Sequence, residues 1–322
     1  MRPSQRRPVH LIAQRHRCRC EGEIRRLAAP LAGGELSPHA PHLERHFKWG
    51  APSLLALLAL SSLVGCPRVP PPTLSRDPAA LLDQVAAGQR RVQRVSGRAR
   101  VKVTSPSLSG TVTELIAAEK PDRLHLETLD FFGNPAAVLV AADGRFALHD
   151  ARGKVFYRGP ATPENISRLL PFDLPVEELV MILCGSAPLL PGTPLEVGAQ
   201  DGLVLLTIGL GDVGQRLALG EQATVVWSRL RREVTAGSPL ALANPGYDLA
   251  FDRFIDHDGV RFPNALDVDA PAGKARVELS WRDVEVNGAV DHGLFQLAQP
   301  PGVRVVDLDG GTPAPRQPVP RE

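Results

Sequence analysis

Two short segments bring acidic and imidazole side chains together, the combination that general acid–base catalysis uses. They are His149-Asp150 and Asp256-His257-Asp258. The first segment is followed by the turn signal Arg152-Gly153, and the second runs into the turn signal Asp258-Gly259. Asp is a common residue in turns. Catalysis or metal binding would need further ligands from elsewhere, and the sequence has no H-E-x-x-H, G-x-S-x-G or P-loop pattern. We therefore expect no enzyme activity, no metal site and no cofactor.

The four cysteines do not suggest a disulfide framework. Cys18 and Cys20 are close together, but no second pair completes a zinc site. Cys184 closes the apolar segment Val176–Leu183, which predicts a buried free thiol. A nucleophilic Cys184 would need a histidine partner, and the sequence places none beside it.

The fourth cysteine, Cys66, follows an apolar run from Ala51 to Val64. That run, about fourteen residues, is too short to span a bilayer and suits the core of a signal peptide. The basic segment 45–48 supplies a cationic flank. Leu63-Val64-Gly65-Cys66 resembles the lipobox of bacterial lipoproteins. The resemblance implies that the Cys66 thiol receives a diacylglyceryl group, that the chain is cut before it, and that the new amino terminus is acylated.

This interpretation divides the chain into four parts. Residues 1–65 are a signal peptide with a long Arg-rich extension, which suggests a translation start further downstream. Residues 66–76 form a lipidated Pro-rich tether, residues 77–309 a β domain, and residues 310–322 a disordered tail. From Cys66 onward, 27 Lys and Arg face 31 Asp and Glu, a net charge of −4. An acidic mature chain argues against nucleic-acid binding.

Period-two alternation predicts strands at residues 98–103, 123–127, 145–149 and 248–252. Asp143-Gly144, Arg152-Gly153 and Asp258-Gly259 predict hairpin turns, and a phase slip near Arg282-Asp283 predicts a β-bulge. Helices are expected to begin after Asp77, after Thr162 and at Val176. These elements indicate a mainly β fold with some helix: one curved antiparallel sheet, an open or half β-barrel, closed by short helices on its concave face.

The order of these elements resembles the LolA/LolB family of lipoprotein carriers in Gram-negative envelopes, and LolB most of all. The LolB-like stretch runs from Leu124 to Ala187. It includes a loop ending Phe132-Gly133, the turn Asp143-Gly144, and two short helices followed by Gly185-Ser186-Ala187-Pro188. Near the C-terminus, Pro300-Pro301-Gly302-Val303-Arg304-Val305 resembles the closing strand of LolA.

The resemblance implies an open β-barrel with a helical lid and a hydrophobic cavity for acyl chains. It also implies a lipoprotein of the outer membrane, facing the periplasm, that receives acylated lipoprotein or lipid cargo from a LolA-like donor. Pro67, after the lipidated cysteine, fits that membrane. Membrane insertion would fall to the loop Phe131, Phe132 and Gly133, because the family has an exposed hydrophobic residue directly before a Gly there. Phe131 stands where the family often has Pro. One ring could instead pack into the core.

Two other roles on the same fold remain open. An RseB-like envelope sensor would also use a LolA-like domain, and a structural accessory to outer-membrane assembly is a further possibility. The lipid anchor and the Phe pair favour delivery of cargo over sensing. We expect a monomer, and residues 192–244 match no segment of the family.

Overall fold

The chain divides into two units, residues 1–69 and 70–322. The structure, a computed structural model, describes residues 73–309 except 107, 168–169, 171–173, 233–245 and 271–273. Residues 1–65, the predicted lipidation site Cys66 and the tail 310–322 lie outside the described residues. The boundaries expected there stay predictions.

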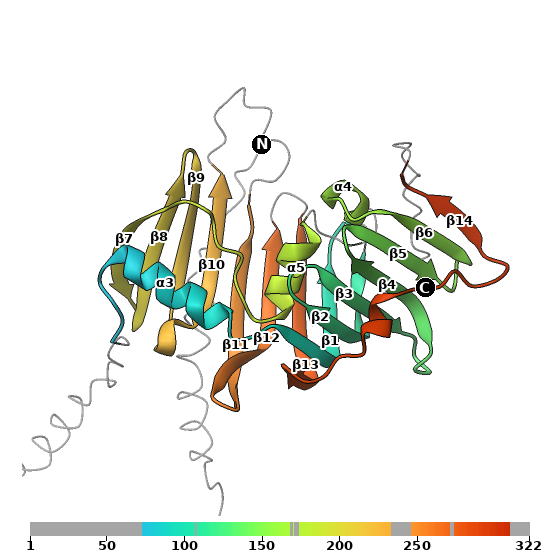
Figure 1. Cartoon of the computed structure of the whole chain (residues 1–322), viewed down its shortest axis with the longest axis horizontal. Helices are drawn as coiled ribbons and strands as arrows, with labels where there is room; N and C mark the ends of the chain where they lie inside the picture. Colours follow the sequence, from blue (N-terminus) through green and yellow to red (C-terminus); the bar gives the residue numbers. More distant parts are fainter. Residues whose placement is uncertain are drawn as a thin grey trace, which may run out of the picture. The chain divides into compact units, whose positions relative to one another are not determined.

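Strands dominate the described residues (Figure 1). The helices are α3 (Pro78–Gln89), α4 (Pro163–Ile166) and α5 (Val176–Leu183), with 3₁₀ turns η2 (Glu221–Ala223) and η4 (His292–Phe295). The strands are β1 (Arg94–Thr104), β2 (Ser109–Glu119), β3 (Arg123–Leu129), β4 (Pro135–Ala142), β5 (Arg145–Asp150), β6 (Val155–Pro160), β7 (Thr193–Gln200), β8 (Leu203–Leu210), β9 (Val213–Leu219), β10 (Val225–Arg232), β11 (Asp248–His257), β12 (Val260–Ala270), β13 (Ala275–Val286) and β14 (Arg304–Asp307).

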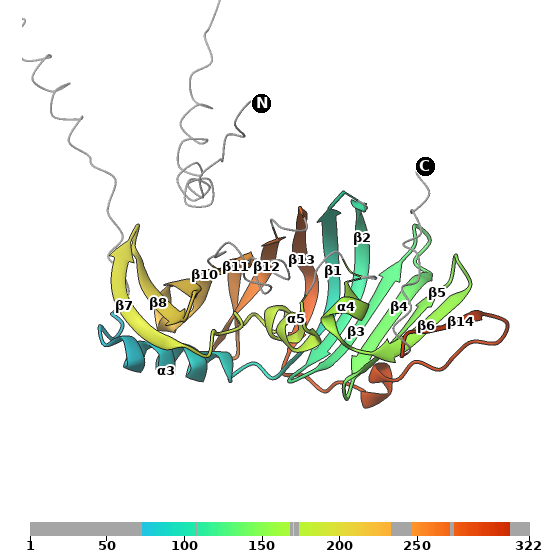
Figure 2. The same cartoon turned by 90° about the horizontal axis from the view of Figure 1, so that it is seen from above.

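The fourteen strands of the described residues belong to one sheet, in the order β14-β6-β5-β4-β3-β2-β1-β13-β12-β11-β10-β9-β8-β7. Neighbours pair antiparallel, except that β14 runs parallel to β6. The sheet is curved and does not close on itself, since β14 and β7 are free edges (Figure 2). The expected fold class, a mainly β chain with one curved open sheet and a few short helices, is confirmed.

The predicted hairpins are present. Asp143, at φ 51°, turns the chain from β4 into β5, and Asp258, at φ 52°, turns it from β11 into β12. The predicted bulge is also present: Arg98 pairs with Asp283 and Ala99 with Trp281, so Arg282 is the extra residue. Because Arg282 is an extra residue, the apolar side chains before and after it point to the same face of the sheet.

The helices begin where the sequence predicts. The Asp77 carboxylate accepts a hydrogen bond from the Ala79 N–H at 3.0 Å, and Thr162 accepts one from the Asn165 N–H. α5 ends at Leu183, and Gly185, just past its end, has a φ of 68°, the left-handed conformation that favours glycine after a helix. Both α3 and α5 lie on the near side of the sheet in Figure 1. None of the helices in the described part of the chain is long and apolar enough to cross a membrane.

One face of the sheet carries the main core, and a smaller cluster of Ala117, Val140 and Phe295 is buried on the other face. Strand pairing places a continuous row of side chains on the side of α3 and α5, from Leu206 in β8 through Leu249 in β11 to Val103 in β1. Leu81 of α3 and Val180 of α5 are fully buried in the same cluster. We call this side the helix-covered face and the other side the opposite face.

Candidate functional site

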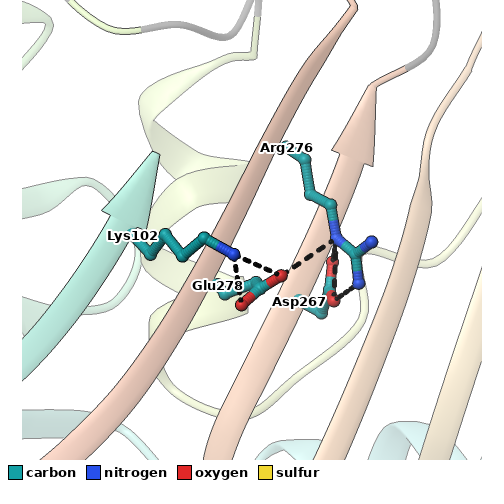
Figure 3. A network of polar contacts seen from close by, with 4 residues as sticks. All are labelled: Lys102, Asp267, Arg276 and Glu278. Carbon is teal, nitrogen blue, oxygen red and sulfur yellow. Dashed lines mark hydrogen bonds and ion pairs between the residues drawn. The ribbon is translucent and has the colours of Figure 1, made fainter. Parts of the chain in front are cut away.

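The opposite face of the sheet is charged near its centre. Lys102 of β1, Glu278 and Arg276 of β13 and Asp267 of β12 form a chain of ion pairs across three neighbouring strands (Figure 3). Lys102 Nζ lies 3.4 Å from Glu278 Oε2, and Arg276 Nε lies 3.5 Å from Glu278 Oε1. Exposed pairs of this kind add little stability but keep a surface hydrated. The larger of the two apolar clusters lies on the helix-covered face.

The predicted insertion loop is an exposed aromatic pair. Phe131 is 96% exposed and Phe132 is 83% exposed, so neither ring packs into the core. Their centroids lie 5.5 Å apart with the rings nearly perpendicular, at 84°. Edge-to-face rings attract each other, but two rings this exposed leave most of their apolar surface in water. The structure thus presents the pair at the surface, and its action on a membrane stays a prediction.

Asp130 holds this loop in shape. Its Oδ1 accepts hydrogen bonds from the N–H groups of Phe132 and Asn134, both at 2.8 Å. Its backbone N–H donates to the Asn134 carbonyl, and Gly133 closes the turn at φ 85°. The backbone hydrogen bond from Asn134 is the main cause that lowers the pKa of the Asp130 carboxyl. The Phe pair is therefore carried on a fixed turn, because an ionised carboxylate accepts both N–H groups.

Other exposed apolar side chains lie at the same end of the sheet. Of the eight large exposed hydrophobic residues in the described part of the chain, six lie in or beside the loops at this end. They are Leu108, Phe131, Phe132, Leu195, Leu210 and Val305. We call this end, with the loops 105–108, 130–134, 151–154 and 211–212, the aromatic rim. The 151–154 loop also carries Arg152 and Lys154, cations of the kind that attract anionic lipid headgroups.

Close to the rim, the helix-covered face holds one buried carboxyl. Glu114 of β2 pairs across the strands with Thr128 of β3, and Thr128 Oγ1 donates to Glu114 Oε1 at 2.7 Å. Glu114 Oε2 is buried and has no hydrogen-bond partner among the described residues. Burial raises the pKa of Glu114 from 4.5 to about 7, and the nearby Glu127 adds to the rise. Sequence analysis missed Glu114.

Two shallow hollows lie on the opposite face, on either side of η4. One, of about 310 Å³, is lined by residues that include Arg145, Phe156 and Phe295. The other, of about 290 Å³, includes Leu115 and His125. The segment between them is fixed by a contact of 2.8 Å between His125 Nδ1 and the Leu294 carbonyl oxygen. Neither hollow was predicted, because the residues lining each are scattered over four or more elements.

The acidic residues that first suggested catalysis stabilise turns. Asp150 Oδ1 accepts the Gly153 N–H at 3.0 Å, and Asp256 Oδ1 accepts the Gly259 N–H at 2.8 Å. Both are the turn contacts that the sequence indicates. Among the described residues, no group of three or more His, Cys, Asp or Glu side chains is placed to hold a metal ion.

Cys184 is a buried free thiol, as predicted. Burial raises the pKa of the thiol to about 12, so it stays protonated and a poor nucleophile at neutral pH. Lys120 lies close by, and its Nζ donates to the Gln89 carbonyl and to Ser186 Oγ. These bonds tie the end of α3 to the segment after α5, which is a structural role.

In sequence, the chain matches no family model and no curated protein. In structure it is similar to a DUF1329 family protein from Desulfovibrio piger, with a TM-score of 0.46 and 12% identity over 69% of this chain and 98% of that one. It is also similar to a LolA superfamily protein from Nitrosomonas europaea, with a TM-score of 0.45 and 8% identity over 68% and 97% of the two chains.

A third similar structure is the lipoprotein LppX from Mycobacterium tuberculosis, with a TM-score of 0.27 and 13% identity over 67% of this chain and 98% of that one. A LolA superfamily protein is thus among the structures to which this chain is similar, as the sequence resemblance predicted. LolB itself is not among these three.

Proposed function

We propose that this protein is a cell-envelope lipoprotein, anchored through Cys66, that binds acyl chains of lipoproteins or lipids and helps to insert them into the outer membrane. The observation that carries the proposal is the Phe131–Phe132 pair, held by Asp130 on a fixed turn at the end of a sheet with one apolar face. Two neighbouring aromatic rings exposed to water mark a surface that contacts an apolar partner.

The helix-covered face suits uptake of cargo, and the aromatic rim suits its release. Uptake is driven by burial of acyl surface against the helix-covered face, at about 0.8 kcal/mol for each buried CH₂ group. Release needs contact with a membrane, which the aromatic rim provides. Each Phe ring that enters the apolar phase gains roughly 1.5–3 kcal/mol, and Arg152 and Lys154 can remain at the headgroups.

The proposed partners follow from these steps. The protein acts as a monomer, receives acylated cargo from a soluble periplasmic donor of the LolA type, and passes it to the membrane that holds its own anchor. An envelope sensor on the same fold would bind cargo and signal to a partner protein. The membrane-directed Phe pair favours delivery, since a sensor has no need to probe a bilayer.

The central test is the substitution Phe132→Glu. A carboxylate is strongly unfavourable at bilayer depth, so the variant should still accept acylated cargo but should transfer it to liposomes at least tenfold more slowly. Because Phe132 is 83% exposed, the melting temperature should change by no more than about 2 °C, as for other surface substitutions. Transfer is followed by fluorescence of a labelled lipopeptide, and melting by circular dichroism.

Ile255→Glu is the matched control, because Ile255 is 46% exposed and lies in β11, outside the loops of the aromatic rim. It should transfer cargo as the unchanged protein does. If both variants transfer cargo at the rate of the unchanged protein, the delivery role is wrong and the sensor role remains. Failure of the unchanged protein to bind any acylated cargo would remove both.

A further inference from the structure

The larger hollow on the opposite face is apolar on one side and cationic on the other. Its cationic side is formed by Arg145 of β5 and Arg158 of β6. Its apolar side is lined by side chains of β4 and of the segment that joins β13 to β14: Val140, Ala142, Phe295 and Leu297. We call it the arginine hollow. This division suits an amphiphile, a ligand with one apolar end and one charged end.

The floor of the arginine hollow crosses three strands. Strand pairing places Val140 of β4, Ala147 of β5 and Arg158 of β6 in one row on the opposite face. The small side chain of Ala147 leaves space in the middle of that row. The hollow measures about 310 Å³. It would hold about ten CH₂ groups, if each fills roughly the 30 Å³ of a water molecule in the liquid.

The two arginines are close enough to share one ligand group. Arg145 pairs with Pro160 across β5 and β6, and Arg158 is two residues before Pro160. Diagonal neighbours of this kind lie about 7–8 Å apart, and both arginines line the same hollow. Because a guanidinium group is carried on a long, flexible stem, one small anion between the two side chains can contact both.

Each arginine already binds one aspartate, and each keeps donors for a second acceptor. Arg145 Nη2 donates to the two carboxylate oxygens of Asp309 at 3.1 and 3.0 Å, and Arg158 Nε donates to Asp307 Oδ2 at 3.2 Å. A guanidinium group has five N–H donors, so most of them are left for a ligand. The four side chains are between 45% and 58% exposed, so these ion pairs are weak and can exchange partners.

The charges favour a head group with a single negative charge. Among the described residues that line the arginine hollow there is no Asp or Glu, so its only formal charges are those of the two arginines. Asp307 and Asp309 lie just beyond the lining, and they repel an anion in proportion to its charge. A carboxylate therefore fits better than a phosphate monoester with two negative charges.

We propose that the arginine hollow binds a medium-chain fatty acid, with its chain over Val140 and Ala147 and its carboxylate at Arg145 and Arg158. This site goes beyond the proposed function, because its ligand is a free acid and it lies on the face away from α3 and α5. Binding of the acid and delivery of acylated cargo are independent, so either can fail without the other.

The test compares three ligands that share a decyl-length chain and differ in the charge of the head group: decanoate, 1-decanol and decyltrimethylammonium. Equilibrium dialysis measures binding to the full chain below micelle-forming concentrations, with Cys66→Ala in every arm so that no attached lipid competes. Two exposed ion pairs should favour decanoate over decanol by about three- to tenfold, and the cation should bind less tightly than the alcohol. The preference for decanoate should decrease at high salt, because salt screens exposed charges.

Substitutions assign the binding to this hollow. Arg145→Gln combined with Arg158→Gln should remove the preference for decanoate and leave binding of decanol unchanged. Arg98→Gln is the matched control, because Arg98 lines the other hollow on the same face. Ala147→Phe fills the floor and should weaken binding of both ligands by about tenfold. Asp309→Asn frees its arginine and should strengthen decanoate binding by about two- to fivefold, so it decides the question if the double variant fails to fold.

Several results would overturn the fatty-acid site. Equal binding of decanoate and decanol would do so, as would a preference for decanoate that survives substitution of both arginines. Tighter binding of the cation would mean that Asp307 and Asp309 select the head group, which is the opposite of the proposal. If none of the three ligands binds, the hollow is not a lipid site, whereas the delivery role is judged separately by transfer of the lipopeptide.

Discussion

At the scale of single residues, surroundings decide what each carboxyl does. Asp130 is exposed, and the backbone N–H groups that it accepts lower its pKa. Glu114 is buried, and loss of water raises its pKa to about 7. The same functional group is thus a fixed anion in the turn and a group that gains or loses a proton near neutral pH in the sheet.

The raised pKa of Glu114 predicts how stability depends on pH. Between about pH 4.5 and pH 7 the folded protein holds a proton that the unfolded chain has lost, so the free energy of unfolding falls as pH rises through that window. The total loss is about 3 kcal/mol. Glu114→Gln removes the ionisation and keeps an oxygen for Thr128, so it should be more stable than the unchanged protein at pH 8 and similar at pH 4.

Urea unfolding at the two pH values measures this difference. Glu278→Gln, on the charged opposite face, is the control and should follow the unchanged protein at both pH values, because Glu278 is exposed. A Glu114→Gln variant that gains no stability at pH 8 would mean that the carboxyl is hydrated in the folded protein.

Sequence predicts the Phe pair but not Glu114, for a physical reason. Phe131 and Phe132 lie between turn-forming residues, so no strand or helix can bury both. In β2, both alternating phases are apolar near the end of the strand: Leu115 and Ala117 on one side, Ile116 on the other. Alternation then does not say which side faces the helices, and the burial of Glu114 depends on β1 and β3, which are paired with it only in the fold.

At the scale of elements, the turn 130–134 is the part of the site whose shape matters most. Asp130→Ala removes the acceptor for Phe132 and Asn134 and loosens the turn. Ordering a freed aromatic side chain on insertion costs about 0.5–1.5 kcal/mol, so liposome binding should weaken about two- to tenfold. Asp130→Asn keeps an acceptor oxygen and should lose less.

Co-sedimentation with vesicles measures the binding, and Asp256→Ala, which breaks an equivalent turn contact at Gly259 outside the aromatic rim, is the control for general loop damage. If both variants bind as the unchanged protein does, the shape of the turn has no part in membrane contact.

Local signals predicted most of the elements, and the exceptions have two different causes. The hairpins, the helix caps and the bulge at Arg282 each have a signal within a few residues. The strands β7 to β10 were not predicted. Asp201-Gly202, between β7 and β8, is a turn signal of the same kind, but Leu203-Val204-Leu205-Leu206 is apolar at every position and shows no period. The parallel pairing of β14 with β6 joins segments about 150 residues apart in sequence, which no local pattern can specify.

At the scale of the whole chain, the lipid anchor is a prediction that a direct measurement can check. Cys66 lies outside the described residues, and its role rests on Leu63-Val64-Gly65-Cys66 and the apolar run before it. Mass spectrometry of the protein purified from its native membrane should find a first residue Cys66 that carries acyl chains. An intact peptide from residues upstream of Cys66 would contradict lipidation and, with it, the cleavage of residues 1–65.

Anchoring and binding should be separable. The proposed uptake depends on apolar burial against the helix-covered face, and the driving force for that burial needs no tether. An exported Cys66→Ala form should therefore bind acylated lipopeptide in solution with the affinity of the anchored protein in detergent. Its transfer of cargo to liposomes should depend more strongly on the aromatic rim, so Phe132→Glu in this background should slow transfer by more than it does in the anchored protein. If the unanchored form folds but binds no acylated cargo, the apolar face is a structural core and the chain is held at the membrane for another purpose.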